Sequence, residues 1–187
     1  MALSDPYVFG PYVFGLAKSV AHTFSKVSCD HLRLVQGLGV EHDAHAGVTV
    51  QHLSRIRQDP DQPNLRQVHL SHGELLDERA EHGYVRAPGA LGENMTTRGL
   101  DILHLATDTR LHIGETVIRV TGLRNPCRQI DDFMPGLLKH MVEKRPDGSL
   151  NRKCGVMAVV ERGGDIAVGA TIRVEVPEGE PVPLEPV

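Results

Sequence analysis

Cys127 is the residue whose neighbours most favour chemistry in this chain. It lies between Arg124 and Arg128, in the run Arg-Asn-Pro-Cys-Arg that follows a strand-like segment. Nearby guanidinium groups favour the thiolate, the form of cysteine that attacks electrophiles and binds metals, and Pro126 fixes the backbone just before the thiol. A small buried thiol is the alternative, because free cysteines are among the most buried residues. Cys127 is therefore a candidate reactive residue.

A second group of side chains could bind a metal. Imidazole and carboxylate groups gather at His42, Asp43, His45 and His52. Both groups ligate zinc, but a structural zinc site usually needs four ligands. The segment has the glycine punctuation of a loop, so no helical spacing brings these side chains together. A polar loop is the simpler interpretation.

A glycine-containing segment offers groups for an anion. It reads Gly89-Ala-Leu-Gly92-Glu93-Asn94. Glycines free backbone N–H groups to face an anion, and Glu93 and Asn94 add hydrogen-bonding side chains. The spacing matches neither a phosphate loop nor a dinucleotide fingerprint, so a plain turn is the alternative.

Charge and composition narrow the class of protein. The 187 residues are 40% hydrophobic and carry a formal charge of −4, which disfavours general nucleic-acid binding. Residues 124–153 hold seven basic and four acidic residues, a local excess that suits a small anionic ligand. The three widely spaced cysteines and the lack of a long apolar run or a typical leader predict a cytoplasmic protein without a membrane span.

The spacing of the remaining elements predicts a strand-rich domain. Short β-like segments follow one another after Pro88 and are separated by glycines, as in barrels and sandwiches. Apolar periodicity predicts helices over Ser71–Gly83 and Phe133–Lys144. The pentapeptide Pro-Tyr-Val-Phe-Gly occurs twice in residues 6–15, and its second copy is expected to lead into the first strand. Further strands are expected at 32–36, 66–70, 94–97, 102–105, 109–113, 115–121, 154–161 and 171–176.

The order of these segments resembles the MOSC domain family, named for the C-terminal region of molybdenum cofactor sulfurase. The resemblance runs from about Lys18 to Val176 and looks like the stand-alone bacterial form. It divides the chain into an N-terminal segment (1–17), a MOSC domain (18–176) and a flexible tail (177–187), whose prolines and glutamates favour solvent. Four stretches carry the resemblance: residues 37–47, 66–70, 92–101 and 121–130.

The resemblance implies a mainly β fold with a strongly bent, barrel-like core of the pyruvate-kinase type and a few short helices. It also implies the molybdenum cofactor (molybdopterin), whose anionic phosphate needs cationic partners. Cys127 would be either a molybdenum ligand or a persulfide carrier, with Glu93 and His69 as the other catalytic residues. The family is also associated with pyridoxal phosphate binding. The residues expected at the cofactor are Lys26, Asp43, Arg66, Asn94, Arg98, Arg124 and Arg152.

The implied activity is the reduction of N-oxygenated small molecules, with electrons from a separate reductase. The alternatives are a sulfur transferase served by a cysteine desulfurase and a carrier that stores the cofactor without turnover. His42 departs from the family pattern, because it stands where a glycine is expected before Asp43. If that position takes a positive φ, histidine is strained there; otherwise His42 adds a ligand or gate beside the pocket.

Overall fold

A curled eight-stranded sheet forms the body of the protein. It is seen in a computed structural model that describes residues 10–84 and 87–187. Neighbouring strands are antiparallel, except that β5 and β6 run parallel. In spatial order the strands are β13 (Arg173–Glu175), β7 (Arg110–Ile113), β8 (Thr116–Leu123), β11 (Val156–Arg162), β5 (Val68–His72), β6 (Met95–Arg98), β1 (Tyr12–Lys18) and β2 (Val27–Cys29).

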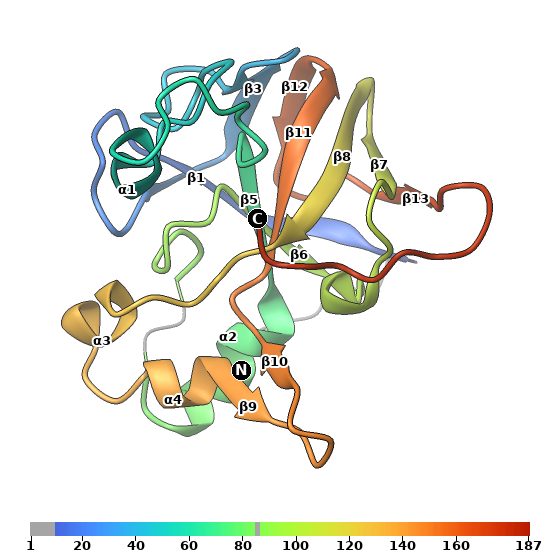
Figure 1. The fold of residues 1–187 in the computed structure, drawn as a ribbon. Coiled ribbons are helices and arrows are strands. Elements are labelled where there is room, and N and C mark those ends of the chain that lie inside the picture. The colour runs from blue at the N-terminus through green and yellow to red at the C-terminus, as the bar shows by residue number, and fades with distance from the viewer. Residues whose placement is uncertain (1–9, 85–86) are drawn as a thin grey trace.

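The sheet curls until β1 meets the segment that precedes β13. Val13 in β1 donates its backbone N–H to Ala170 and accepts from Gly169, just ahead of β13. A smaller sheet of β12 (Gly164–Ala167), β3 (His31–Val35) and β4 (Gly39–Val40) completes the wall (Figure 1). The expected mainly β, barrel-like core is confirmed.

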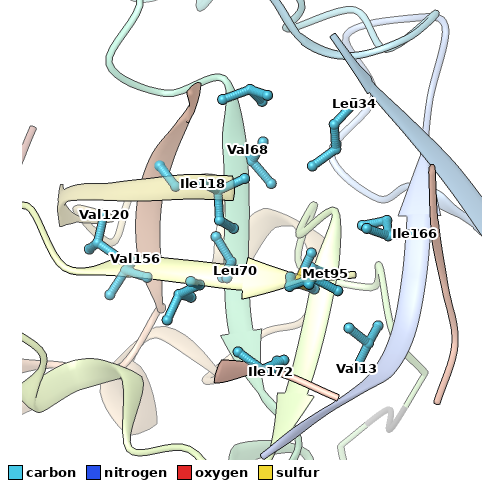
Figure 2. Close-up of a cluster of buried hydrophobic side chains, with 14 of the residues drawn as sticks. Val13, Leu34, Val68, Leu70, Met95, Ile118, Val120, Val156, Ile166 and Ile172 are labelled. Atoms are coloured by element: carbon cyan, nitrogen blue, oxygen red, sulfur yellow. The ribbon is translucent and has the colours of Figure 1, made fainter. Parts of the chain in front are cut away.

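The interior of the barrel is filled by one apolar cluster. Inward side chains alternate with outward ones, so that Leu32 and Leu34 of β3 are buried between exposed neighbours. Figure 2 shows Val13, Ile118 and Ile166, from three different strands, in the same cluster. Removing this apolar surface from water is the main stabilising contribution to the barrel.

Short helices gather at one end of the barrel (Figure 1). A second apolar cluster, which includes Leu75, Ile130, Met141 and Cys154, packs them together. Within the described ranges, no helix is long and apolar enough to cross a bilayer. The elements are α2 (Gly73–Glu81), α3 (Gln129–Phe133), α4 (Leu138–Met141) and the hairpin of β9 (Val142–Lys144) and β10 (Leu150–Arg152), with α1 (Leu53–Ile56) and a 3₁₀ turn η1 (Ile102–His104) elsewhere.

Two predicted elements are wrong. The helix expected over 133–144 is replaced by the end of α3, then α4 and β9. Met134 is extended before Pro135, and Gly136 has a φ of 82°, so the chain turns where apolar periodicity alone predicted a helix. Residues 102–105 were expected to form a strand, but 102–104 form the 3₁₀ turn η1. This turn buries Ile102 without an extended backbone. The helix predicted over Ser71–Gly83 is confirmed as α2.

β1 is part of the barrel, and the C-terminal segment of the chain contacts the barrel. The second copy of the pentapeptide leads into β1 as predicted, whereas residues 6–9 of the first copy lie outside the described residues. Residues 177–187, expected to be a flexible tail, are mostly exposed but run beside β8. Leu123 donates its N–H to Glu185 and accepts from Val187, and Leu184 is only 8% exposed. The expected division into three segments stays a prediction.

Truncating Leu184 tests this attachment. We expect Leu184→Ala to lower the free energy of unfolding by about 2 kcal/mol, because it removes a buried apolar side chain. Val182 is 60% exposed, so Val182→Ala is expected to change the free energy of unfolding by less than about 0.5 kcal/mol. Urea denaturation of both variants makes the comparison, and equal stabilities would contradict an anchored tail.

Candidate functional site

A cavity of about 530 Å³ opens beside the barrel, between the wall formed by β5 and β11 and three loops. The loops contain Phe24, His52 and Cys127. Among the described residues that line it, none is Asp or Glu. Its basic lining residues are Lys26, Arg55, Arg57, Arg66, Arg124 and Arg128.

Three of the arginines form a like-charged cluster. Burial, together with repulsion from Arg55 and Arg124, lowers the pKa of Arg66 to about 10. Arg124 donates to the carbonyl of Leu91 at 2.7 Å. None of the three guanidinium groups forms an ion pair with a carboxylate of the described residues. A group of half-buried cations without a counter-charge favours an anionic ligand.

A buried ion pair supports one wall of the cavity. The Lys26 ammonium lies 2.5 Å from the Asp43 carboxylate, and both side chains are almost fully buried. Burial would raise the pKa of Asp43, but hydrogen bonds from His45 and the charge of Lys26 outweigh burial and hold that pKa below its usual range. Burial lowers the pKa of Lys26, and Asp43 offsets part of the effect. Asp43 is therefore an ionised anchor for the loops around it.

Asn94 links this ion pair to His69. Its side-chain amide donates to Asp43 at 3.0 Å, and its side-chain oxygen accepts the His69 backbone N–H at 3.2 Å. His69 Nε2 donates to the carbonyl of Cys154 at 2.8 Å. Burial lowers the pKa of His69 well below its ordinary value, so the ring is neutral. Both residues line the cavity.

Cys127 is the thiol at the cavity. It is exposed, and its sulfur lies 3.5 Å from the side-chain oxygen of Gln129. Cys154 is buried in the helical cluster, and burial raises the pKa of its thiol to about 11, so the expectation that it is a core residue is confirmed. The Arg128 side chain is 91% exposed and pairs with Asp132. Arg124 and Arg128, which flank Cys127 in the sequence, both line the cavity.

Three residues expected at the site lie elsewhere. Glu93 is buried outside the cavity and accepts the backbone N–H of Leu91 at 3.0 Å. Arg98 pairs with Asp77 and covers the ring of Phe14. Arg152 lines a separate cavity of about 710 Å³ beside the C-terminal segment. Over the described ranges, no three His, Cys, Asp or Glu side chains are grouped to hold a metal, so Cys127, Glu93 and His69 do not meet.

Two arginines of the cavity were missed by sequence reasoning. Arg55 and Arg57 belong to or directly follow α1, a four-residue helix for which the sequence has no clear periodic signal. Their nearness in sequence to His52 was the only available indication. Folding of the loop brings Arg55 close to Arg66.

His42 adopts the backbone expected of a glycine. Its φ is 62°, in the left-handed region, and its side chain is 73% exposed. The residue does not line the cavity. Of the two interpretations of this departure, the strained backbone fits the structure, and a ligand or gate does not.

Solved structures of similar fold come from bacteria. The YuaD protein from Bacillus subtilis superposes with a TM-score of 0.70 at 22% identity, covering 90% of this chain and 97% of that chain. YiiM from Escherichia coli superposes with a TM-score of 0.62 at 19% identity, covering 92% of this chain and 73% of that chain. YiiM from Geobacillus stearothermophilus superposes with a TM-score of 0.56 at 18% identity, covering 88% of this chain and 72% of that chain. These likenesses establish the fold. No curated protein matches the chain in a sequence comparison.

The fold and the site together define a barrel-like β protein with a cationic cavity beside an exposed cysteine. The family model of the MOSC domain matches residues 44–173. The chain therefore belongs to the MOSC domain family.

Replacing His42 tests the backbone strain. We expect His42→Gly to raise the free energy of unfolding by about 0.5–1 kcal/mol, because glycine adopts a positive φ without the steric cost of a Cβ. His82 is an exposed histidine with a φ of −94°, and His82→Gly should not stabilise the protein. The measurement is urea denaturation. Loss of stability in His42→Gly would show that the histidine makes a compensating contact.

Proposed function

We propose that the cavity binds the molybdenum cofactor through its anionic phosphate and that Cys127 provides a thiolate to the metal. The observation that carries this proposal is the cluster of Arg55, Arg66 and Arg124, for which the described residues provide no carboxylate partner and no acidic lining of the cavity. Guanidinium groups bind phosphate through paired N–H donors. Membership of the MOSC family supports the choice of cofactor.

The residues present fit this group. The volume of about 530 Å³ falls in the range of small-molecule sites. Arg66 and Arg124 would hold the phosphate, and the amide of Asn94 is positioned by Asp43 at the same wall. The single thiolate of Cys127 is the soft ligand that molybdenum would take from the chain. Glu93 lies outside the cavity, and His69 Nε2 is hydrogen-bonded to the carbonyl of Cys154, so Cys127 is the one of the three expected ligands that we propose for the metal.

The bound cofactor would supply two-electron reduction, and the substrate class we propose is N-oxygenated small molecules. The chain's own residues would bind the cofactor and orient the substrate. The arginines neutralise the anionic cofactor, and the open cavity admits a small substrate. No group of three metal-ligating side chains occurs in the part of the chain that the structure describes, so electrons are expected from a separate reductase.

The Cys127→Ser variant tests the metal role. Protein purified from cells that make the cofactor is expected to contain molybdenum and pterin in near-equal amounts. Cys127→Ser should lose most of the molybdenum or bind it weakly, because it removes the soft sulfur donor and leaves a hydroxyl that is protonated near neutral pH. Cys29→Ser, at a thiol outside the cavity, is the matched control. Metal and pterin are measured by mass spectrometry and fluorescence.

The outcomes separate the alternatives. Wild-type protein without pterin would overturn cofactor binding. Pterin and molybdenum without reduction of any N-oxygenated compound, given an artificial electron donor, would indicate a carrier instead of an oxidoreductase.

A second candidate function rests on the exposure of Cys127. An exposed thiol at an open cavity can react with a partner protein, as a sulfur transferase requires. In that reaction the Cys127 thiolate attacks the outer sulfur of a desulfurase persulfide. An S–S bond forms on Cys127, and the desulfurase thiolate leaves.

Intact-mass analysis tests this second function. Incubation with a cysteine desulfurase and cysteine is expected to add one sulfur atom to the wild type and none to Cys127→Ser, because Cys154 is buried. Cys29→Ser should still gain the sulfur. Unchanged wild-type mass, or addition to Cys127→Ser as well, would contradict the transferase.

A further inference from the structure

We propose that His45 is the residue that exchanges protons with the ligand in the cavity, and that Asp43 positions it. His45 lines the cavity and its side chain is 22% exposed. Its Nδ1 lies 3.2 Å from Asp43 Oδ1, and its backbone N–H donates to the same oxygen at 3.0 Å. Two contacts to one oxygen fix both the backbone and the ring.

The charge of Asp43 determines the tautomer of this ring. Asp43 is ionised and can only accept hydrogen bonds, so Nδ1 of His45 must carry a proton. Nε2 is then the nitrogen that can take up and release a proton. None of the described residues hydrogen-bonds Nε2 of His45. An aspartate that holds a histidine in this way also stabilises the positive ring when Nε2 is protonated.

The environment of Asp43 keeps this arrangement fixed. Its other oxygen accepts from Lys26, Asn94 and the backbone of Ser19, at 2.5, 3.0 and 3.1 Å. Rotation of the carboxylate would break all of these contacts. His45 is thus oriented by a group that is itself held in place, which is what a proton-transfer site requires.

The other histidines of the cavity are less suited to proton exchange. His69 is buried, and its Nε2 donates to the carbonyl of Cys154. His22 Nε2 donates to the carbonyl of Gln51. Burial, together with repulsion from His45 and nearby arginines, lowers the pKa of His52 to about 4. Among these four histidines, only His45 contacts a carboxylate.

This role rests on the proposed function, because reduction of an N-oxygenated compound consumes protons. For a hydroxylamine, the N–O bond breaks and two electrons enter from the separate reductase. The oxygen leaves as water after taking one proton, and the nitrogen takes the second. His45 donates the proton to the leaving oxygen from Nε2 and regains it from solvent at the cavity opening. General-acid catalysis of this kind typically contributes at least about 100-fold to the rate.

The first test needs no cofactor. In ¹⁵N-histidine-labelled, cofactor-free protein, we expect the neutral His45 ring to show a protonated Nδ1 and a bare Nε2, assigned from the loss of its signals in His45→Asn. His104, whose Nδ1 lies 2.9 Å from Asp101 on the surface, provides a reference for the same tautomer. A protonated Nε2 and bare Nδ1 in His45 would overturn the proposal, whatever the activity.

The second test uses the loaded protein. His45→Asn keeps a donor for Asp43 but removes the nitrogen that exchanges protons, so kcat should fall roughly 100-fold while molybdenum and pterin contents stay the same. His104→Asn is the matched control and should keep its kcat. An unchanged kcat in His45→Asn would overturn the proposal. The expected tautomer in a wild type without reductase activity would support the positioning of His45 and contradict the proposed reduction.

Discussion

The buried ion pair between Lys26 and Asp43 is the interaction on which the site depends. Removing two charges from water costs several kcal/mol for each ion, and their attraction offsets this only with further hydrogen bonds. Asp43 receives those bonds from Ser19, His45 and Asn94. These donors come from segments that follow β1, follow β4 and precede β6. One carboxylate therefore joins three separate parts of the chain into a single wall.

The arginine cluster differs electrostatically from this ion pair. Around Arg66, positive charges meet without a carboxylate partner among the described residues, and burial with mutual repulsion lowers the pKa of this guanidinium. Natural proteins rarely bury like charges unless a ligand neutralises them. Like charges held together lower the stability of the folded protein. The apolar clusters of the barrel and of the helices offset this loss. The hydrogen bonds and ion pair of Asp43 thus hold one part of the cavity in place. The arginines give another part an excess of positive charge, as anion binding requires.

Sequence reasoning succeeded where local rules decide the outcome. Glycine-separated strands predicted a barrel or a sandwich, and the family resemblance selected the barrel. A left-handed backbone at His42 was one of two interpretations left open, and it is the one that the structure contains. It failed where long-range packing decides. Periodicity over 133–144 predicted a helix, but Pro135 and Gly136 divide it. Arg55 reaches the cavity through a loop fold that no local pattern encodes, and Glu93 turns away to bond the Leu91 backbone.

The position of Cys127 changes the reason for regarding it as reactive. Its two sequence neighbours suggested that flanking arginines favour the thiolate, but Arg128 extends into solvent and pairs with Asp132. Arg124 instead turns to the cavity and bonds the carbonyl of Leu91. An exposed thiol at the edge of a cation-lined cavity can react with an anionic ligand that the cavity binds, and it is also open to a partner protein. The chemistry of Cys127 therefore depends on the folded cavity as a whole.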